Sequence, residues 1–254
     1  MSSSIPPTDN VTPMADSETI SKSIPSDPFS QDLYKHVRDH LDTSILAHSL
    51  RVYMYASALA KADLSPISHL HPTAGPEIFS NPDGDEDKDD HHHIEASLLF
   101  AACMFHDMGT SAAHDHDQRF EVCGADAAVA YMSANDGGAD RADRRRVWEA
   151  IALHTSPGIA ERMSLLTRVL RMAVKADFGS EQYRSLLGEG FVERTEALFP
   201  RGVVEKVLGD CVAGQAERRQ GERRSMKAPA VSWPWNLLRS RLENPGWEGV
   251  NKGF

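Results

Sequence analysis

Apolar residues recur at intervals of three and four along most of this chain, and this spacing constrains the fold more than any other feature. Such a period places the residues on one face of an α-helix, whereas a half-buried strand needs strict alternation. Between residues 43 and 62, one stripe holds Ile45, Val52 and Leu59. Alternating runs of Val and Ile are missing from the sequence. The pattern therefore predicts an all-α fold, without a repeat of solenoid period.

The helical pattern returns in successive segments separated by turn-forming residues. Asp42 or Thr43 is a suitable N-cap for the longest segment, because a short side chain with an oxygen accepts a hydrogen bond from the free backbone amides of the first turn. The predicted helices span residues 29–41, 43–62, 94–108, 118–134, 142–154, 162–177, 181–187, 191–198 and 201–219.

Two segments fall outside this pattern. Residues 1–27 are rich in Ser, Thr, Pro and Asp, and such a composition predicts a disordered tail. Residues 63–93 contain four prolines and an acidic run, which indicate a long acidic loop inserted within one domain. We therefore expect a single-domain helical bundle over residues 28–254, with its motif core at about 40–180 and C-terminal helices and a tail over 181–254.

Charge and composition limit the classes of partner. The formal net charge is −10, which argues against nucleic acid because binding to phosphates depends on Lys and Arg. The one basic run, residues 218–227, is typical of a solvated helix end. No stretch approaches ~20 apolar residues, so no membrane partner is expected. The three cysteines have no CxxC spacing, which favours a reducing compartment, and we expect a cytoplasmic protein.

Five polar residues lie on the apolar faces of these predicted helices. They are His48, the adjacent pair His106 and Asp107, His154, and Asp177. Each has a plain structural explanation when taken alone. A core histidine needs one hydrogen bond, a histidine at a helix C-terminus is favoured by the dipole, and a carboxylate can cap the next segment. A buried carboxylate without a partner, however, costs several kcal/mol.

The coincidence of these residues on four separate predicted helices indicates a shared site. Two imidazoles and two carboxylates form a nitrogen and oxygen ligand set that suits one divalent metal ion, such as Zn²⁺, Fe²⁺, Mn²⁺ or Co²⁺. Such an ion acidifies bound water toward neutral pH, so the water becomes a nucleophile. The pattern therefore predicts a metal-dependent enzyme with a small-molecule substrate.

The motifs resemble those of the HD-domain superfamily of metal-dependent hydrolases, whose signature is H…HD…D, and more closely its cyanamide hydratase-like branch. This resemblance implies an all-α bundle that binds one metal, most commonly zinc, and adds water to a small nitrile-type carbon. The signature is filled by His48, His106, Asp107 and Asp177, which the resemblance implies as metal ligands. The wider similarity covers residues 40–180 and rests on His48–Tyr53, Phe105–Thr110, Arg119–Ala125 and Glu149–His154.

Within this scheme Asp107 and His154 are the expected catalytic residues. His154 would shuttle a proton or orient the substrate, since an imidazole titrates near neutral pH. Glu121 is either a partner of a ligand histidine or an ordinary acidic residue at a helix start. Arg51, one turn after His48, either holds a substrate anion or lies on the surface.

Two alternative functions stay open. Many phosphohydrolases of the superfamily carry a lysine shortly after the His-Asp pair, whereas the residues after His106-Asp107 are Met, Gly, Thr and Ser, which disfavours a nucleotide or phosphomonoester substrate. Cyanamide hydratases have His-Gln where this chain has His154 and Thr155, which departs from their pattern. The second alternative is a non-catalytic regulatory module that keeps its metal for structure.

Several further residues carry less weight. The runs 91–93 and 114–117 contain His and Asp but are expected to be solvated, although either could lie over the mouth of a pocket. Cys103 lies one turn before His106, and a small buried thiol is more often filler than ligand. Tryptophans at 233, 235 and 247 indicate that the C-terminal tail packs either on the bundle or on another copy of the chain in a homo-oligomer.

Overall fold

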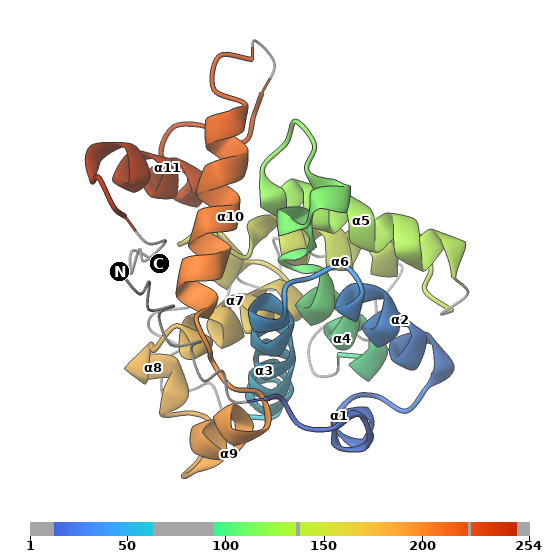
Figure 1. Ribbon diagram of the computed structural model, residues 1–254. Helices are drawn as coiled ribbons and strands as arrows, with labels where there is room; N and C mark the ends of the chain where they lie inside the picture. Colours follow the sequence, from blue (N-terminus) through green and yellow to red (C-terminus); the bar gives the residue numbers. More distant parts are fainter. Residues whose placement is uncertain (1–12, 63–93, 136–137, 223–224, 248–254) are drawn as a thin grey trace, which may run out of the picture.

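The computed structural model describes residues 13–62, 94–135, 138–222 and 225–247, and over these residues the chain is helical (Figure 1). No strand occurs in the described ranges, where the extended backbone makes only one isolated bridge, between Gln118 and Met226. The predicted all-α class is therefore confirmed. The loop 63–93, with the histidines at 91–93, lies outside the described residues, as do residues 1–12.

Most predicted helices are present with shifted ends. The α-helices are α1 (Ser17–Ser23), α2 (Pro28–Arg38), α3 (Thr43–Leu59), α4 (Ala96–Phe105), α5 (Phe120–Ala134), α6 (Arg141–Leu153), α7 (Leu165–Asp177), α8 (Glu181–Arg184), α9 (Phe191–Leu198), α10 (Val204–Arg218) and α11 (Trp233–Glu243). Short 3-10 turns are η3 (Met108–Thr110), η4 (Ala112–His114) and η5 (Ala160–Arg162).

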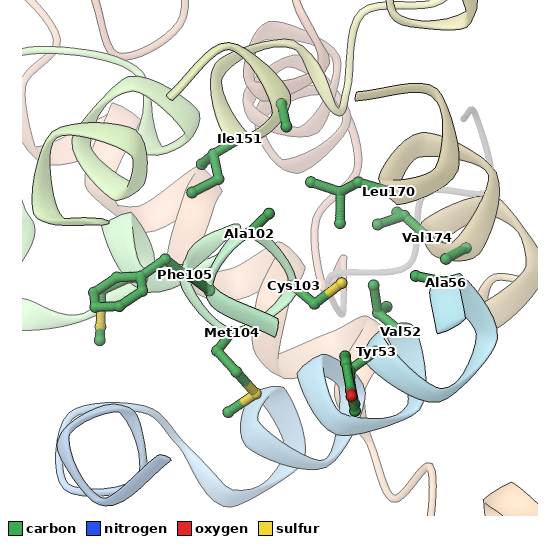
Figure 2. Close-up of a cluster of buried hydrophobic side chains, with 14 of the residues drawn as sticks. Val52, Tyr53, Ala56, Ala102, Cys103, Met104, Phe105, Ile151, Leu170 and Val174 are labelled. Carbon is green, nitrogen blue, oxygen red and sulfur yellow. The ribbon is translucent and has the colours of Figure 1, made fainter. Parts of the chain in front are cut away.

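The core is built around α4. This helix is apolar on every side, and its residues from Leu98 to Phe105 are all buried. A helix of this kind belongs in the interior, because it has no polar face to give to water. It packs against α2, α3, α5, α6 and α7. Figure 2 shows the junction, where Cys103 of α4 lies among Val52 of α3, Ile151 of α6 and Leu170 of α7.

The prediction of a disordered tail over residues 1–27 is wrong for the part that the structure describes. Residues 17–23 form α1, and the side chain of Asp16 caps this helix by accepting from Thr19 N at 2.8 Å. Ile20 and Ile24, four residues apart, are both buried. Their spacing is helical, and burial against the bundle compensates for a composition that is otherwise too polar to fold alone.

Helix boundaries follow local capping chemistry. Asp42 caps α3 as predicted, since its side chain accepts from Ser44 N at 2.7 Å. The predicted helix 94–108 ends at Phe105, because the chain turns through His106 and Asp107 into η3. The sequence prediction missed α11, which begins at a Ser232 cap with Pro234 in its first turn.

The C-terminal segment packs on the bundle. Trp233 and Leu237 are buried in the main apolar cluster, which confirms one of the two arrangements expected from the tryptophans. Lys227 is also buried, and its ammonium group contacts Asp115 at 2.8 Å and Gln215 at 3.0 Å. None of the helices in the described ranges has both the length and the apolar character needed to cross a membrane.

Two glycines allow α5 to lie directly on the turn that holds the His-Asp pair. A Cβ atom at Gly109 would lie 2.0 Å from the backbone oxygen of Phe120, and one at Gly124 would lie 2.7 Å from the backbone oxygen of Phe105. Real Cβ contacts are not that short, so neither position accepts a side chain without a backbone shift. This close packing fixes where the pair points.

Candidate metal centre

His48, His106 and Asp107 form one buried cluster. His48 comes from the middle of α3, while His106 is the last residue of the helical turn that ends α4 and Asp107 begins the turn into η3. None of the three is more than 1 % exposed. Their potential ligand atoms all lie within 4.8 Å of one another, as metal ligands must.

The distances inside the cluster are short. Asp107 Oδ2 lies 3.2 Å from His106 Nε2 and 3.5 Å from His48 Nε2. The two Nε2 atoms are themselves 3.1 Å apart. Three atoms that all carry lone pairs therefore face one small volume.

The partners of the other ring nitrogens show why this volume suits a cation. His48 Nδ1 donates to Asp177 Oδ2 at 2.6 Å, and His106 Nδ1 donates to the Cys103 carbonyl at 2.7 Å. In the neutral tautomer that carries its hydrogen on Nδ1, each ring offers a lone pair on Nε2, which is the form that binds a metal ion. Asp107 Oδ2 is buried without a hydrogen-bond partner among the described residues. A divalent cation would satisfy all three atoms.

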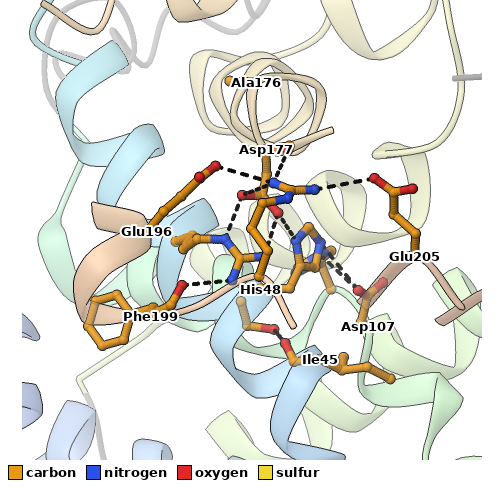
Figure 3. A network of polar contacts seen from close by, with 12 residues as sticks. Ile45, His48, Asp107, Ala176, Asp177, Glu196, Phe199 and Glu205 are labelled. Carbon is orange, nitrogen blue, oxygen red and sulfur yellow. Dashed lines mark hydrogen bonds and ion pairs between the residues drawn. The ribbon is translucent and has the colours of Figure 1, made fainter. Parts of the chain in front are cut away.

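Asp177, the expected fourth ligand, is not brought into this cluster. Figure 3 shows that it lies at the end of α7, on the other side of the His48 ring. Arg51 donates to both of its oxygens, from Nε to Oδ1 at 2.7 Å and from Nη2 to Oδ2 at 2.8 Å, and Arg201 contacts Oδ1 at 3.3 Å. Its carboxylate therefore fixes the His48 ring through Nδ1.

Arg51 is neither a surface residue nor, in this arrangement, a binding group for a substrate anion. Its side chain is fully buried, and its remaining amino group donates to the carbonyls of Phe199 and Pro200 at 2.9 and 3.0 Å. The spacing of Arg51 one turn after His48 is the sequence signal for this contact. Arg201, which also contacts the backbone oxygen of Asp177, carried no such signal.

His154 borders the cluster. It caps the C-terminus of α6, and its Nδ1 donates to the Ile151 carbonyl at 2.6 Å, so that Nε2 is the free acceptor. This Nε2 lies 3.9 Å from Asp107 Oδ1, and the ring lies 5.1 Å from that of His106 at 89°. The structure thus places the two expected catalytic residues, His154 and Asp107, next to each other.

Burial and charge act in opposite directions on the acidic groups. Burial disfavours the Asp107 carboxylate, but His106, His48 and His154 outweigh it and lower the pKa of Asp107 to about 2. Burial likewise opposes ionisation of Asp177, while Arg51 and His48 hold its pKa far below the ordinary value.

For His154 burial dominates, followed by the charge of His106, and together they lower the pKa of the imidazole to about 3.

Glu121 is buried, but its hydrogen bonds in the described structure do not go to a ligand histidine. Its carboxylate accepts from Arg119 Nη2 at 2.6 Å and Nε at 3.2 Å, and from the Thr155 hydroxyl. Arg119 Nη2 also donates to Thr155 at 3.1 Å. Sequence reasoning singled out Glu121 but did not anticipate Arg119 as its partner.

The remaining candidates lie outside the cluster. Cys103 contributes its backbone carbonyl, while burial raises the pKa of its thiol and keeps it protonated. In the run 114–117, Asp115 pairs with Lys227 and Arg218, and Asp117 pairs with Arg219. These acidic residues hold α10 and the C-terminal segment in place.

Comparison with known proteins supplies no family. The chain matches neither any of the family models nor any of the curated proteins with which it was compared.

Proposed function

We propose that the chain is a metal-dependent hydratase or hydrolase of the HD type, in which His48, His106 and Asp107 hold one divalent ion. Zn²⁺ is the ion that we propose, ahead of Fe²⁺, Mn²⁺ and Co²⁺. The observation that carries this proposal is the set of three buried atoms that face one another, His48 Nε2, His106 Nε2 and Asp107 Oδ2. Both imidazole rings are oriented by hydrogen bonds at Nδ1. A bound ion of this kind supplies the acidity that makes water a nucleophile at neutral pH. Asp177 is a positioning residue in this scheme, because it orients His48.

The residues around the cluster have separate roles. Since His154 Nδ1 is bound to the Ile151 carbonyl, Nε2 is the atom that accepts a hydrogen bond on the side of Asp107. Because burial lowers the pKa of this imidazole to about 3, the ring stays neutral at neutral pH, and of the two expected roles we keep orientation of the substrate or water over proton shuttling. The apolar helix α4 and Phe120, whose ring lies 5.6 Å from that of His154, exclude bulk water from this side. An electrophilic carbon is the reacting centre that we propose, as in the hydration of a nitrile.

A phosphate-ester substrate is less well supported. The guanidinium groups of Arg51 and Arg201 both contact the Asp177 carboxylate beside the cluster, so neither is available to a phosphate bound at the metal itself. The turn after Asp107 carries no lysine.

A non-catalytic metal site is the second candidate, and one observation favours it. The three cluster residues are almost fully buried, as in structural zinc sites whose ligands are closed to solvent.

Turnover measurements separate these functions. The zinc-loaded wild type, His154→Ala and His106→Ala are assayed in parallel on cyanamide, simple nitriles, isonitriles and a nucleotide panel. We expect hydration of a carbon substrate by the wild type and a loss of at least a hundredfold in His154→Ala, with its metal retained. Phosphate release from nucleotides without any hydration product would refute this function. Bound metal with no turnover on any class would favour the structural role.

A further inference from the structure

A pocket of about 310 Å³, lined by both polar and apolar side chains, lies between the turn that follows α6, the residue before α5 and the start of α11. Its wall includes Arg119, Thr155, Arg171, Trp233 and Asn236. Small-molecule sites range from about 300 to 1,000 Å³, so this pocket suits a compact organic molecule.

His154 connects this pocket with the candidate metal centre. Thr155, in the pocket wall, is the next residue in the chain, and Arg171 Nη1 donates to the His154 carbonyl at 3.0 Å. The Phe120 ring lies 5.6 Å from the His154 ring and 5.6 Å from the Trp233 ring. The Phe120 ring thus lies between His154, which is buried and not part of the pocket wall, and Trp233, which is part of it.

Two guanidinium groups lie in the pocket wall, those of Arg119 and Arg171, and each is paired with a buried glutamate. Both oxygens of Glu121 are taken by Arg119, and those of Glu161 are taken by Arg171 Nε at 3.1 Å and Gly158 N at 2.6 Å. The described hydrogen bonds of Arg119 use Nε and Nη2, and those of Arg171 use Nε and Nη1. Each guanidinium therefore keeps one amino group for a ligand.

Burial strengthens this preference for an acceptor. The Arg171 side chain is 1 % exposed, although it reaches the pocket wall. Hydrogen bonds from a guanidinium to a carboxylate are charge-assisted, and the planar donor geometry matches the two oxygens. Ile159 and Val231, at the same pocket, are largely exposed apolar side chains, and with Trp233 they offer contact to an apolar body.

We propose that this pocket binds the carboxylate of a small organic acid with an apolar body, and that this acid is the substrate of the centre proposed above. The assignment of this acid as the substrate rests on the proposed function, whereas the binding of a carboxylate rests on the pocket alone. The reacting carbon then lies on the His154 side of the bound molecule, and the carboxylate is held by Arg119 and Arg171.

Calorimetric titration of the zinc-loaded protein with benzoate and with benzamide, its uncharged isostere, tests the pocket. We expect benzoate to bind at least tenfold more tightly than benzamide. In Arg119→Gln the benzoate affinity should fall at least tenfold, because one of the two guanidinium donors is removed. Arg145→Gln is the matched control, since its side chain is 80 % exposed and lies elsewhere, and it should bind benzoate like the wild type.

Equal affinity for benzoate and benzamide, no detectable binding of benzoate, or unchanged binding by Arg119→Gln would each overturn the proposed ligand class. Arg119 is substituted rather than Arg171 because its side chain is 24 % exposed, and a glutamine amide at this position can still donate to the buried Glu121 carboxylate, which also keeps the Thr155 hydroxyl as a partner. Circular dichroism of each variant checks its folding directly.

Proton relaxation of bound benzoate tests the link with the metal centre. In protein that contains Co²⁺ by metal analysis, the ring protons should relax faster than in the Zn²⁺ form. Equal relaxation in the two forms would overturn the assignment of this pocket to the substrate. If the protein takes up no Co²⁺, the proposed metal centre and the assignment of the bound acid as its substrate both fail. The benzoate titration still decides whether the pocket binds a carboxylate.

Discussion

Asp177 shows how much a single side chain can do without being a ligand. Its carboxylate satisfies the buried Arg51 guanidinium and holds His48 Nδ1, so the same residue stabilises the fold and orients the candidate metal ligand. Carboxylates that bind the outer nitrogen of a ligand histidine commonly strengthen metal binding, and their loss costs roughly 10- to 100-fold in affinity.

We therefore predict that Asp177→Asn binds Zn²⁺ roughly 10- to 100-fold more weakly than the wild type. Asp210→Asn, a change in a partly exposed acidic residue on α10, should leave the affinity unchanged. Competition with a chromogenic chelator measures both. A loss as large as that in His106→Ala would instead make Asp177 a direct ligand.

Arg51 allows a test of the same contact through stability. Arg51→Met leaves the Asp177 carboxylate buried without its main partner, and removing one member of a buried ion pair costs about 3–5 kcal/mol. Urea unfolding of the metal-free protein should show a loss of this order at neutral pH. Arg145→Met, on the surface, should change the free energy of unfolding by less than about 0.5 kcal/mol. A small effect in Arg51→Met would contradict the buried pair.

The packing of α5 on the His-Asp turn is a property of two elements. Gly124 has no room for a methyl group against the Phe105 carbonyl. A Cβ atom at Gly214 in α10 would meet the far ends of the Arg218 and Arg241 side chains, at 3.4 and 3.8 Å. Both glycines lie in helices, so alanine has the same intrinsic helix preference at each. A difference between the stability effects of the two Gly→Ala substitutions therefore reports the close approach of the backbones at Gly124.

We predict that Gly124→Ala lowers the free energy of unfolding by about 1–3 kcal/mol, because the added methyl group forces the backbones apart. Gly214→Ala should be neutral or stabilising by up to about 1 kcal/mol, as expected for Ala in a helix. Thermal and urea unfolding of both variants measure the contrast. Equal effects of the two substitutions would mean that α5 does not lie against the turn.

At the scale of the whole molecule, the apolar core includes members from α1 to α11. The helices of this core were predictable from their apolar period, and His48, His106 and Asp107 were predictable as a cluster because each interrupts an apolar face. Asp177 was expected at the same point in space, but its contact with Arg51 depends on the register of α3 against α7. No local pattern specifies that register.

The elements that escaped prediction are those stabilised by docking. α1 has two buried isoleucines in a polar segment, and α11 follows a proline-containing stretch, so neither has a strong period of its own. Their helicity comes from burial against the rest of the molecule, which a window of sequence does not contain.

Docking of α1 predicts a stability effect where a disordered tail predicts none. Ile20→Ala should lower the free energy of unfolding by about 2 kcal/mol, the lower end for truncation of a buried isoleucine. Leu242→Ala is the control, since Leu242 is 52 % exposed, and its effect should stay near zero. Chemical unfolding of both variants measures these effects. An Ile20→Ala variant as stable as the wild type would contradict the packing of α1 on the bundle.

The most direct measurement for the central claim is the metal content of the purified protein and two of its histidine variants. We predict one divalent ion per chain in the wild type, its loss in His106→Ala, and its retention in His116→Ala, where an exposed histidine of the 114–117 run is removed. A wild type that carries no more metal than His106→Ala would contradict the claim that His48, His106 and Asp107 form a metal centre.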